Sequence, residues 1–248
     1  MSVSAVSTPA KVLVPDIPIS DYLQDDPQPA RRFFWQRPME TPPVTSSWGV
    51  SEEEKALVSF NSDKAARLSA IQREVGVWAM RNFGEKSLGT NPQLGIIEEV
   101  GELAKAILKK DQGIRGTPEK HDSDAVDAIG DIAIYLMNHL NVTSLDIGPL
   151  FYGAWFIRID LVTYVSDYIP ANDETRRKLF RDLSNLIPAV LDSDQRAIGH
   201  LLGYLDLLSR SYGFPSLLDV VEKTWSIVGK RNWVEDAHGG GNHTHEQS

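Results

Sequence analysis

Two stretches of sequence decide the fold: Gly95-Ile-Ile-Glu-Glu-Val-Gly-Glu-Leu-Ala-Lys-Ala-Ile-Leu-Lys-Lys110 and Asp124-Ala-Val-Asp-Ala-Ile-Gly-Asp-Ile-Ala-Ile-Tyr-Leu-Met-Asn138. In each stretch apolar residues recur at the spacing of an α-helix and form one continuous face. Polar residues form a second face on each helix. They are Glu98, Glu99, Glu102, Lys105 and Lys109 in the first stretch and Asp124, Asp127, Asp131, Tyr135 and Asn138 in the second. The sequence therefore predicts two amphipathic helices, each with several carboxylates on one side.

The connection between these helices, Lys110 to Ser123, is short enough for two antiparallel neighbours. Two carboxylate faces that meet would repel one another unless a cation lay between them. Oxygen-only ligand sets suit Mg²⁺ or Mn²⁺, and a magnesium site of this kind handles phosphate groups. The alternative is that both faces are solvated helix surfaces, as an isolated Glu-Glu-x-x-Glu generally is.

Four segments resemble the MazG-like all-α nucleoside triphosphate pyrophosphohydrolases: Ile71-Gln-Arg-Glu-Val-Gly-Val-Trp-Ala-Met-Arg-Asn-Phe83, Gly95 to Glu102, Leu108-Lys-Lys-Asp-Gln-Gly-Ile-Arg-Gly116 and Asp127 to Leu136. A further segment, Leu218 to Trp233, looks like the closing helix of such domains, and we expect it to be helical from about Ser216 to Trp233.

The family pattern is a Glu-Glu-x-x-Glu helix followed by a Glu-x-x-Asp helix that together bind magnesium. The first half matches at Glu98, Glu99 and Glu102, and Asp131 fits the final position of the second half. The chain departs from the pattern three residues earlier, where Ala128 replaces the family's Glu. We expect the neighbouring Asp127 to supply that carboxylate.

The resemblance implies Mg²⁺-dependent hydrolysis of a (deoxy)nucleoside triphosphate to the monophosphate and pyrophosphate, for control of the nucleotide pool or clearance of nucleotides. Glu98 and Glu99 would be catalytic, and the metal ligands would be Glu98, Glu99, Glu102, Asp127 and Asp131. The main alternative is a nucleotide-binding or helical interaction protein whose catalytic site is degraded, as Ala128 suggests. A nucleoside diphosphate hydrolase and a helical scaffold are two further alternatives.

Eight other residues are predicted to bind the substrate: Trp78, Asn82, Lys109, Arg115, Tyr135, Asn138, Lys230 and Arg231. In relatives the first helix contributes to the base pocket, so we assign Trp78 and Asn82 to the base. Lys109, Arg115, Lys230 and Arg231 are assigned to phosphate oxygens. The alternatives are a core role for Trp78, ordinary solvated cations, and interaction of Lys230 and Arg231 with a helix dipole.

Composition narrows the classes of function. A net charge of −9 argues against an extended surface for nucleic acid, which would need clustered Lys and Arg. The absence of cysteine excludes disulfides, Cys-zinc sites and thiol nucleophiles. The N-terminus lacks the pattern of a signal peptide, and no apolar run approaches the length of a membrane helix, so we expect a cytoplasmic protein without a membrane partner. Relatives assemble as dimers or tetramers, which implies a homo-oligomer.

The chain is expected to be all-α: a MazG-like helical bundle with additional C-terminal helices. We predict a flexible Pro-rich arm at 1–50, the MazG-like catalytic helices at 51–141, a helical extension with the closing helix at 142–235, and a disordered tail at 236–248. Within the arm, Arg31-Arg-Phe-Phe-Trp-Gln-Arg37 is aromatic and basic. It would dock on its own domain or a sister subunit, or else bind a partner or cover the nucleotide.

The extension shows one hint of a degenerate repeat. Asp122 to Leu136 is echoed by Asp192-Ser-Asp-Gln-Arg-Ala-Ile-Gly-His-Leu-Leu-Gly-Tyr-Leu205, with one residue deleted. Chance similarity between two amphipathic helices is the alternative.

HD phosphohydrolases are excluded because no histidine precedes His121, and a di-iron bundle is excluded because Glu235 to His238 is the only Glu-x-x-His.

Overall fold

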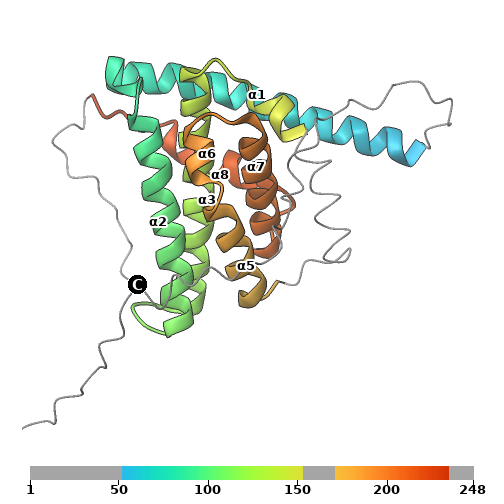
Figure 1. Ribbon diagram of the computed structural model, residues 1–248, viewed down its shortest axis with the longest axis vertical. Coiled ribbons are helices and arrows are strands. Elements are labelled where there is room, and N and C mark those ends of the chain that lie inside the picture. The colour runs from blue at the N-terminus through green and yellow to red at the C-terminus, as the bar shows by residue number, and fades with distance from the viewer. Residues whose placement is uncertain (1–51, 153–170, 235–248) are drawn as a thin grey trace, which may run out of the picture. The chain divides into compact units, whose positions relative to one another are not determined.

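The computed structural model describes residues 52–152 and 171–234, with side chains from residue 62 onward. The predicted arm at 1–50, its Arg31–Arg37 segment and the tail at 236–248 lie outside the described residues. The described part of the chain contains helices and turns and no strand, which confirms the all-α class (Figure 1). Within the same part, no helix combines the length and apolar character needed to cross a bilayer.

The elements follow in a simple order. They are α1 (Glu52–Phe83), the 3-10 helix η3 (Gly84–Ser87), α2 (Asn91–Gln112), α3 (Pro118–Val142), α5 (Asp173–Ser184), α6 (Ile187–Leu191), α7 (Gln195–Ser211) and α8 (Leu217–Val228). Residues 147–152 are also helical. The two stretches with carboxylate faces are therefore in α2 and α3, as predicted.

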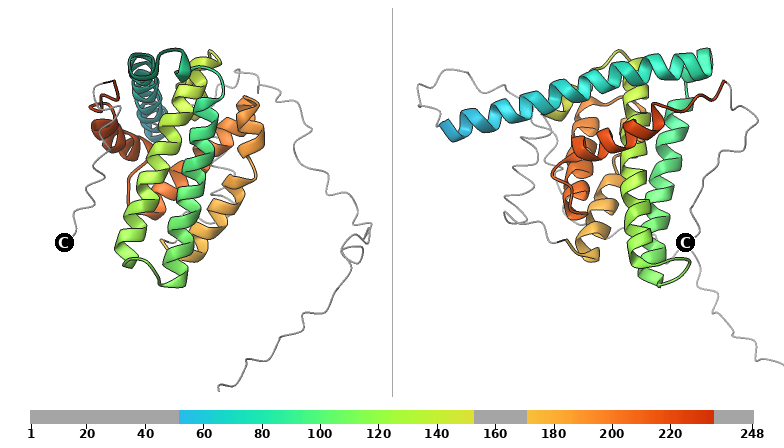
Figure 2. Two further views of the ribbon diagram at one scale, coloured as in Figure 1. Left: turned by 90° about the vertical axis from the view of Figure 1, so that its left-hand side faces the viewer. Right: turned by 180° about the vertical axis from the view of Figure 1, so that it is seen from behind.

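Local sequence explains where α2 ends and α3 begins. Gly113 follows α2 in the left-handed conformation (φ 63°) and donates its N–H to the carbonyls of Lys109 and Lys110. Thr117 then caps α3 by accepting a hydrogen bond from the Lys120 N–H, and Pro118 occupies the first turn, where its missing N–H costs nothing. The loop is short, so the two helices return side by side (Figure 2).

Contacts at both ends of this pair define its antiparallel register. The Tyr135 ring lies so close to Gly95 that a β-carbon at residue 95 would overlap it. At the other end, Lys110 Nζ donates to Asp122 Oδ1 over 2.7 Å. Each residue further along α2 therefore meets an earlier residue of α3.

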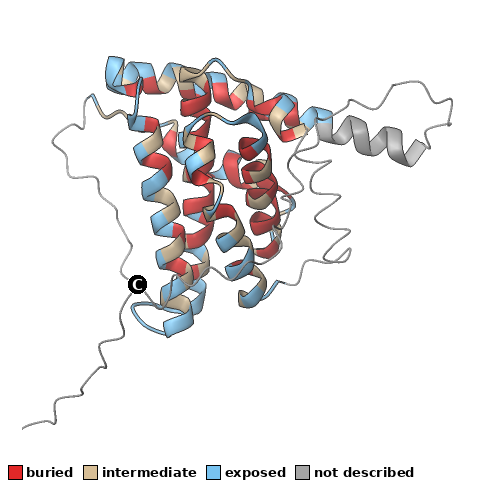
Figure 3. Cartoon of the chain, in the orientation of Figure 1, coloured by how far each residue is buried: buried red, intermediate tan, exposed pale blue. Residues whose placement is uncertain are grey.

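The remaining helices cover the apolar faces of α2 and α3. Buried residues line the inner sides of the helices (Figure 3). The fully buried members of this one core include Leu68, Ile71 and Val75 of α1, Ile96 and Leu103 of α2, Ile129, Ile132 and Leu136 of α3, Leu201 and Leu205 of α7, and Val220 and Val221 of α8. α8 comes closest to α3 at Gly130, where a β-carbon would overlap Thr224. A glycine inside a helix lowers stability, so its presence commonly has a packing reason. At Gly130 that reason is the close approach of Thr224.

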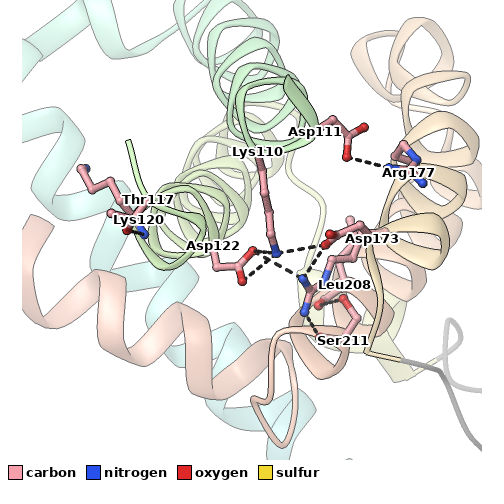
Figure 4. A network of polar contacts seen from close by, with 10 residues as sticks. Lys110, Asp111, Thr117, Lys120, Asp122, Asp173, Arg177, Leu208 and Ser211 are labelled. Carbon is pink, nitrogen blue, oxygen red and sulfur yellow. Dashed lines mark hydrogen bonds and ion pairs between the residues drawn. The ribbon is translucent and has the colours of Figure 1, made fainter. Parts of the chain in front are cut away.

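Two polar networks fix the helices in place. Gln72 of α1 is buried and bonds the turn after α3: its Nε2 donates to Leu145 O (2.7 Å), and its Oε1 accepts from Ile147 N (2.7 Å). At the far end of the α2–α3 pair, Arg176 of α5 joins Lys110 and Asp122 (Figure 4). These bonds satisfy polar groups that would otherwise be buried without partners.

α8 is shorter than predicted. It ends at Val228 rather than near Trp233, and the next residues leave the helical path. Gly229 follows the last helical residue, and beyond it side chains of α1 bond the backbone of Arg231 and Trp233. We call residues Gly229–Val234 the C-terminal strap.

The repeat hypothesis stays a prediction. The two similar segments contribute to α3 and α7, but their first residues lie in different structures. Asp122 lies inside α3, whereas Asp192 precedes α7, and Asp194 caps that helix by accepting from the Ala197 N–H (2.8 Å).

Candidate functional site

The antiparallel register brings the predicted carboxylates of α2 and α3 together. Glu99 lies four residues after Gly95, and Asp131 lies four residues before Tyr135, so the two acids stand opposite one another. Both are half-buried, while Glu98 and Asp127 are exposed beside them. We call Glu98, Glu99, Glu102, Asp127 and Asp131 the acidic cluster.

The electrostatics of Glu99 confirm that the two faces meet. Its pKa is raised to about 8, first by burial and then by the negative charges of Asp131, Glu98, Glu102 and Asp127. The pKa of Asp131 is raised to about 6, again first by burial and then by Asp127. A cation at this position would relieve the repulsion that these shifts express.

Tyr135 closes one side of the acidic cluster. Its ring covers Gly95, and its pKa is raised by burial and then by the charge of Glu99. Tyr135 therefore lies beside the acids of the cluster. Its contact with a substrate stays a prediction.

The acidic cluster has the right kind of donor atoms for magnesium, but its side chains do not converge on one point. Every member offers carboxylate oxygens, the ligands that hard divalent cations prefer. Among the residues that the structure describes, however, no three His, Cys, Asp or Glu side chains are placed to hold one ion. One cause is visible at Glu102, whose carboxylate is drawn to Lys105 Nζ in a 3.0 Å ion pair on the same helix. A shared cation would require Glu102 to leave Lys105.

One cation, Arg231, already acts on the cluster from the C-terminal strap. Its charge lowers the pKa of Asp131 and of Tyr135, partly offsetting the effects that raise them. Its predicted role in binding phosphate stays a prediction. Lys230 lies next to it and is exposed.

Trp78 and Asn82, predicted to bind a base, bond the chain's own C-terminal strap. Trp78 Nε1 donates to Arg231 O (3.0 Å), which uses the only donor of the indole. Asn82 Oδ1 accepts from Trp233 N (2.7 Å). A base that accepted a hydrogen bond from Trp78 would have to replace the strap carbonyl, so contact with a base stays a prediction.

Lys109 and Arg115 are not brought to the acidic cluster. Lys109 lies ~15 Å from Glu99 along the helix axis, at 1.5 Å per residue, and donates to Gln112 Oε1 (3.0 Å). Arg115 is further away, in the loop after α2, with a left-handed backbone (φ 62°). Asn138 lies at the Tyr135 end of α3, where its Nδ2 donates to Ser87 O at 3.5 Å.

The sequence analysis did not identify the residues that allow the helices around the acidic cluster to pack closely. Gly95 admits the Tyr135 ring and Gly130 admits Thr224, and both are glycines inside helices, which was the available signal. Trp225 of α8 was not singled out from the sequence. Its indole donates to Glu74 Oε2 (2.7 Å), a long-range bond that no periodicity predicts.

The chain matches no family model, no curated protein and no solved structure in the comparisons with known proteins. Its function is therefore argued from the acidic cluster and the residues around it.

Proposed function

We propose that this protein hydrolyses a nucleoside triphosphate to the monophosphate and pyrophosphate with the help of Mg²⁺. The observation that carries the proposal is the facing of two acidic helices. Burial at this contact, together with the neighbouring carboxylates, raises the pKa of Glu99 to about 8. Such a cluster is unfavourable without a cation, and cations held between carboxylates serve phosphate chemistry. The resemblance of these same residues to the MazG-like pyrophosphohydrolases supports the choice of reaction.

In this proposal Glu98, Glu99, Glu102, Asp127 and Asp131 hold Mg²⁺, with Mn²⁺ as a substitute. The bound cation supplies neutralisation of phosphate charge and a lower pKa for a water molecule at the α-phosphorus. Glu98 is exposed at the edge of the cluster, where its carboxylate can orient that water and accept its proton.

Arg231 has the other role that the geometry supports. A guanidinium binds phosphate oxygens in pairs, and its fixed charge favours an anionic ligand beside carboxylates that would otherwise repel it. Tyr135 lines the same edge, with its hydroxyl available as a hydrogen-bond donor.

A second candidate function is a nucleotide-binding protein without catalysis. Two observations favour it: Ala128 occupies a buried position instead of supplying a carboxylate, and Glu102 is paired with Lys105. On this alternative the acidic cluster binds a cation and a nucleotide but leaves the phosphoanhydride intact.

The deciding experiment incubates the protein with each common (d)NTP and with modified ones, plus Mg²⁺ or Mn²⁺, and identifies the products. We expect pyrophosphate and a monophosphate. Glu99→Gln should retain less than a tenth of the activity, a loss of at least ~1.4 kcal/mol of transition-state stabilisation. Glu174→Gln, an exposed acid of α5 outside the cluster, is the matched control and should remain active. Inorganic phosphate as the sole product would contradict the proposal, and no turnover with nucleotide binding retained would favour the second candidate.

A further inference from the structure

The C-terminal strap is held on α1 by two side chains one helical turn apart. Trp78 Nε1 bonds the carbonyl of Arg231 (3.0 Å), and Asn82 Oδ1 bonds the N–H of Trp233 (2.7 Å). Asn82 Nδ2 also donates to Trp78 O (2.9 Å), which fixes the orientation of its amide. The backbone is therefore fixed at Arg231 and again two residues later.

The anchor on α1 is itself rigid. The Trp78 ring meets the rings of Phe83 and Trp225 edge to face, with centroids 5.5 and 6.0 Å apart. Trp225 belongs to α8, and its indole N–H bonds Glu74 of α1 over 2.7 Å. α8 and the strap that follows it are thus tied to α1 on both sides of Gly229.

The same path leads past the acidic cluster. α8 packs against α3 at Gly130, the residue next to Asp131. In the view from behind, the strap continues from the end of α8 below α1 and across the upper part of the α2–α3 pair (Figure 2, right). The Arg231 side chain is exposed although its backbone is held, so the guanidinium is available to a ligand.

We propose that Trp78 and Asn82 are positioning residues that hold the Arg231 guanidinium at the edge of the acidic cluster, where it binds a phosphate group of the nucleotide. The inference rests on the proposed function and deepens it. It differs from the sequence prediction for Trp78 and Asn82, because it assigns them to the phosphate end of the ligand through the strap, with no contact to a base. Bonds from both residues go to backbone atoms of the strap, so the position they fix is independent of the strap's other side chains.

The test uses the full chain and two probes, inorganic pyrophosphate and a nucleoside monophosphate, each titrated calorimetrically with Mg²⁺ present. Arg231→Ala and Asn82→Leu should each weaken pyrophosphate binding about tenfold or more, since each removes or displaces a charged hydrogen-bond donor. The double variant should be no weaker than Arg231→Ala alone, because a residue that acts through Arg231 has no effect once Arg231 is gone. Trp78→Phe, which keeps a ring and removes the donor, should show the same non-additivity.

Two controls separate positioning from folding. Arg73→Ala removes an exposed guanidinium of α1 outside the cluster and should leave pyrophosphate binding unchanged. Hydrogen exchange of the Trp233 amide should accelerate in Asn82→Leu and stay slow in Arg231→Ala, which shows whether the strap has been released without reference to any ligand.

Three outcomes would overturn the inference. Equal weakening by Asn82→Leu with and without Arg231 would mean that Asn82 acts by another route. An effect of Asn82→Leu on the monophosphate but not on pyrophosphate would assign Asn82 to the base. Absence of pyrophosphate binding in the wild-type protein would remove the proposed function as well, whereas the first two outcomes leave that function standing.

Discussion

Glu99 is the residue at which the meeting of α2 and α3 has its largest electrostatic effect. Its carboxyl has a pKa of about 8 in the folded protein and an ordinary value of 4.5 when the chain is unfolded. Between these values the folded state binds more protons than the unfolded state. The contribution of Glu99 is therefore most favourable below pH 4.5 and is lost as the pH rises through 8.

The first prediction concerns Glu99→Gln in metal-free protein. At pH 8 this variant should unfold with a free energy about 1–2 kcal/mol higher than wild type, a figure reduced for solvent screening of a half-exposed group. At pH 5 the difference should shrink toward zero, because the wild-type carboxyl is then protonated. Denaturant unfolding with a chelator across this pH range measures both values, and a difference independent of pH would contradict the assignment.

The second prediction concerns the neighbouring positions of α3. Ala128 is 3% exposed, so it lies on the buried side of the helix. Ala128→Glu should therefore lower the melting temperature and should not raise activity, because it buries a carboxylate without a partner. Asp127→Asn should impair hydrolysis as strongly as Asp131→Asn. Asp124→Asn should have a mild effect, since Asp124 is paired with Lys120 one turn away. A silent Asp127→Asn in the hydrolysis assay would show that α3 lacks its second ligand.

At the scale of elements, α5 is attached to the α2–α3 pair by two adjacent arginines in different surroundings. Arg176 is nearly buried: its guanidinium bonds Asp122 and Asp173, donates to Ser211 O (2.6 Å) and lies 4.1 Å from the centre of the Tyr212 ring. Arg177 is exposed and pairs with Asp111 at 2.6 Å (Figure 4). The Arg177–Asp111 distance is short, but an exposed ion pair contributes little to stability. We therefore expect the nearly buried Arg176 to contribute more.

The third prediction uses this adjacent pair as its own control. Arg176→Leu should lower the free energy of unfolding by about 3 kcal/mol. It leaves the Ser211 carbonyl without its donor and leaves Asp122 and Asp173 with Lys110 as their shared cation. Arg177→Leu should lower it by less than about 1 kcal/mol, as exposed ion pairs do. Urea unfolding of both variants measures the difference. Equal effects would mean that the buried network contributes no more than a surface pair.

At the scale of the whole molecule, the proposed metal site would couple ion binding to folding. α2 and α3 carry its residues and also much of the core, so a ligand that bridges them stabilises the folded chain as a unit.

The fourth prediction is that Mg²⁺ raises the melting temperature of wild type and not of Glu99→Gln. At a concentration about 100 times the dissociation constant, the stabilisation would be about 2.7 kcal/mol. Mn²⁺ should act similarly, and Na⁺ at equal ionic strength is the control for charge screening. Equal shifts in both proteins would show that the ion binds elsewhere.

The sequence by itself determined the all-α class, the paired apolar and acidic faces of 95–110 and 124–138, and the turn between them. These features depend on residues close together in the chain: helical periodicity, Gly113 after a helix, and Thr117 with Pro118 before the next one. The antiparallel pairing followed from the short loop. Local signals of this kind can be read without coordinates, because each is set by one or two turns of backbone.

Only the tertiary structure decided which partners the predicted residues have. Trp78 and Asn82 bond the strap from about 150 positions away in the sequence. Lys105 holds Glu102, and burial raises the pKa of Glu99 to about 8. The physical reason is that such outcomes depend on which of several available partners a side chain reaches and how much water is excluded there. Both are properties of the packed helices and not of the spacing along one of them.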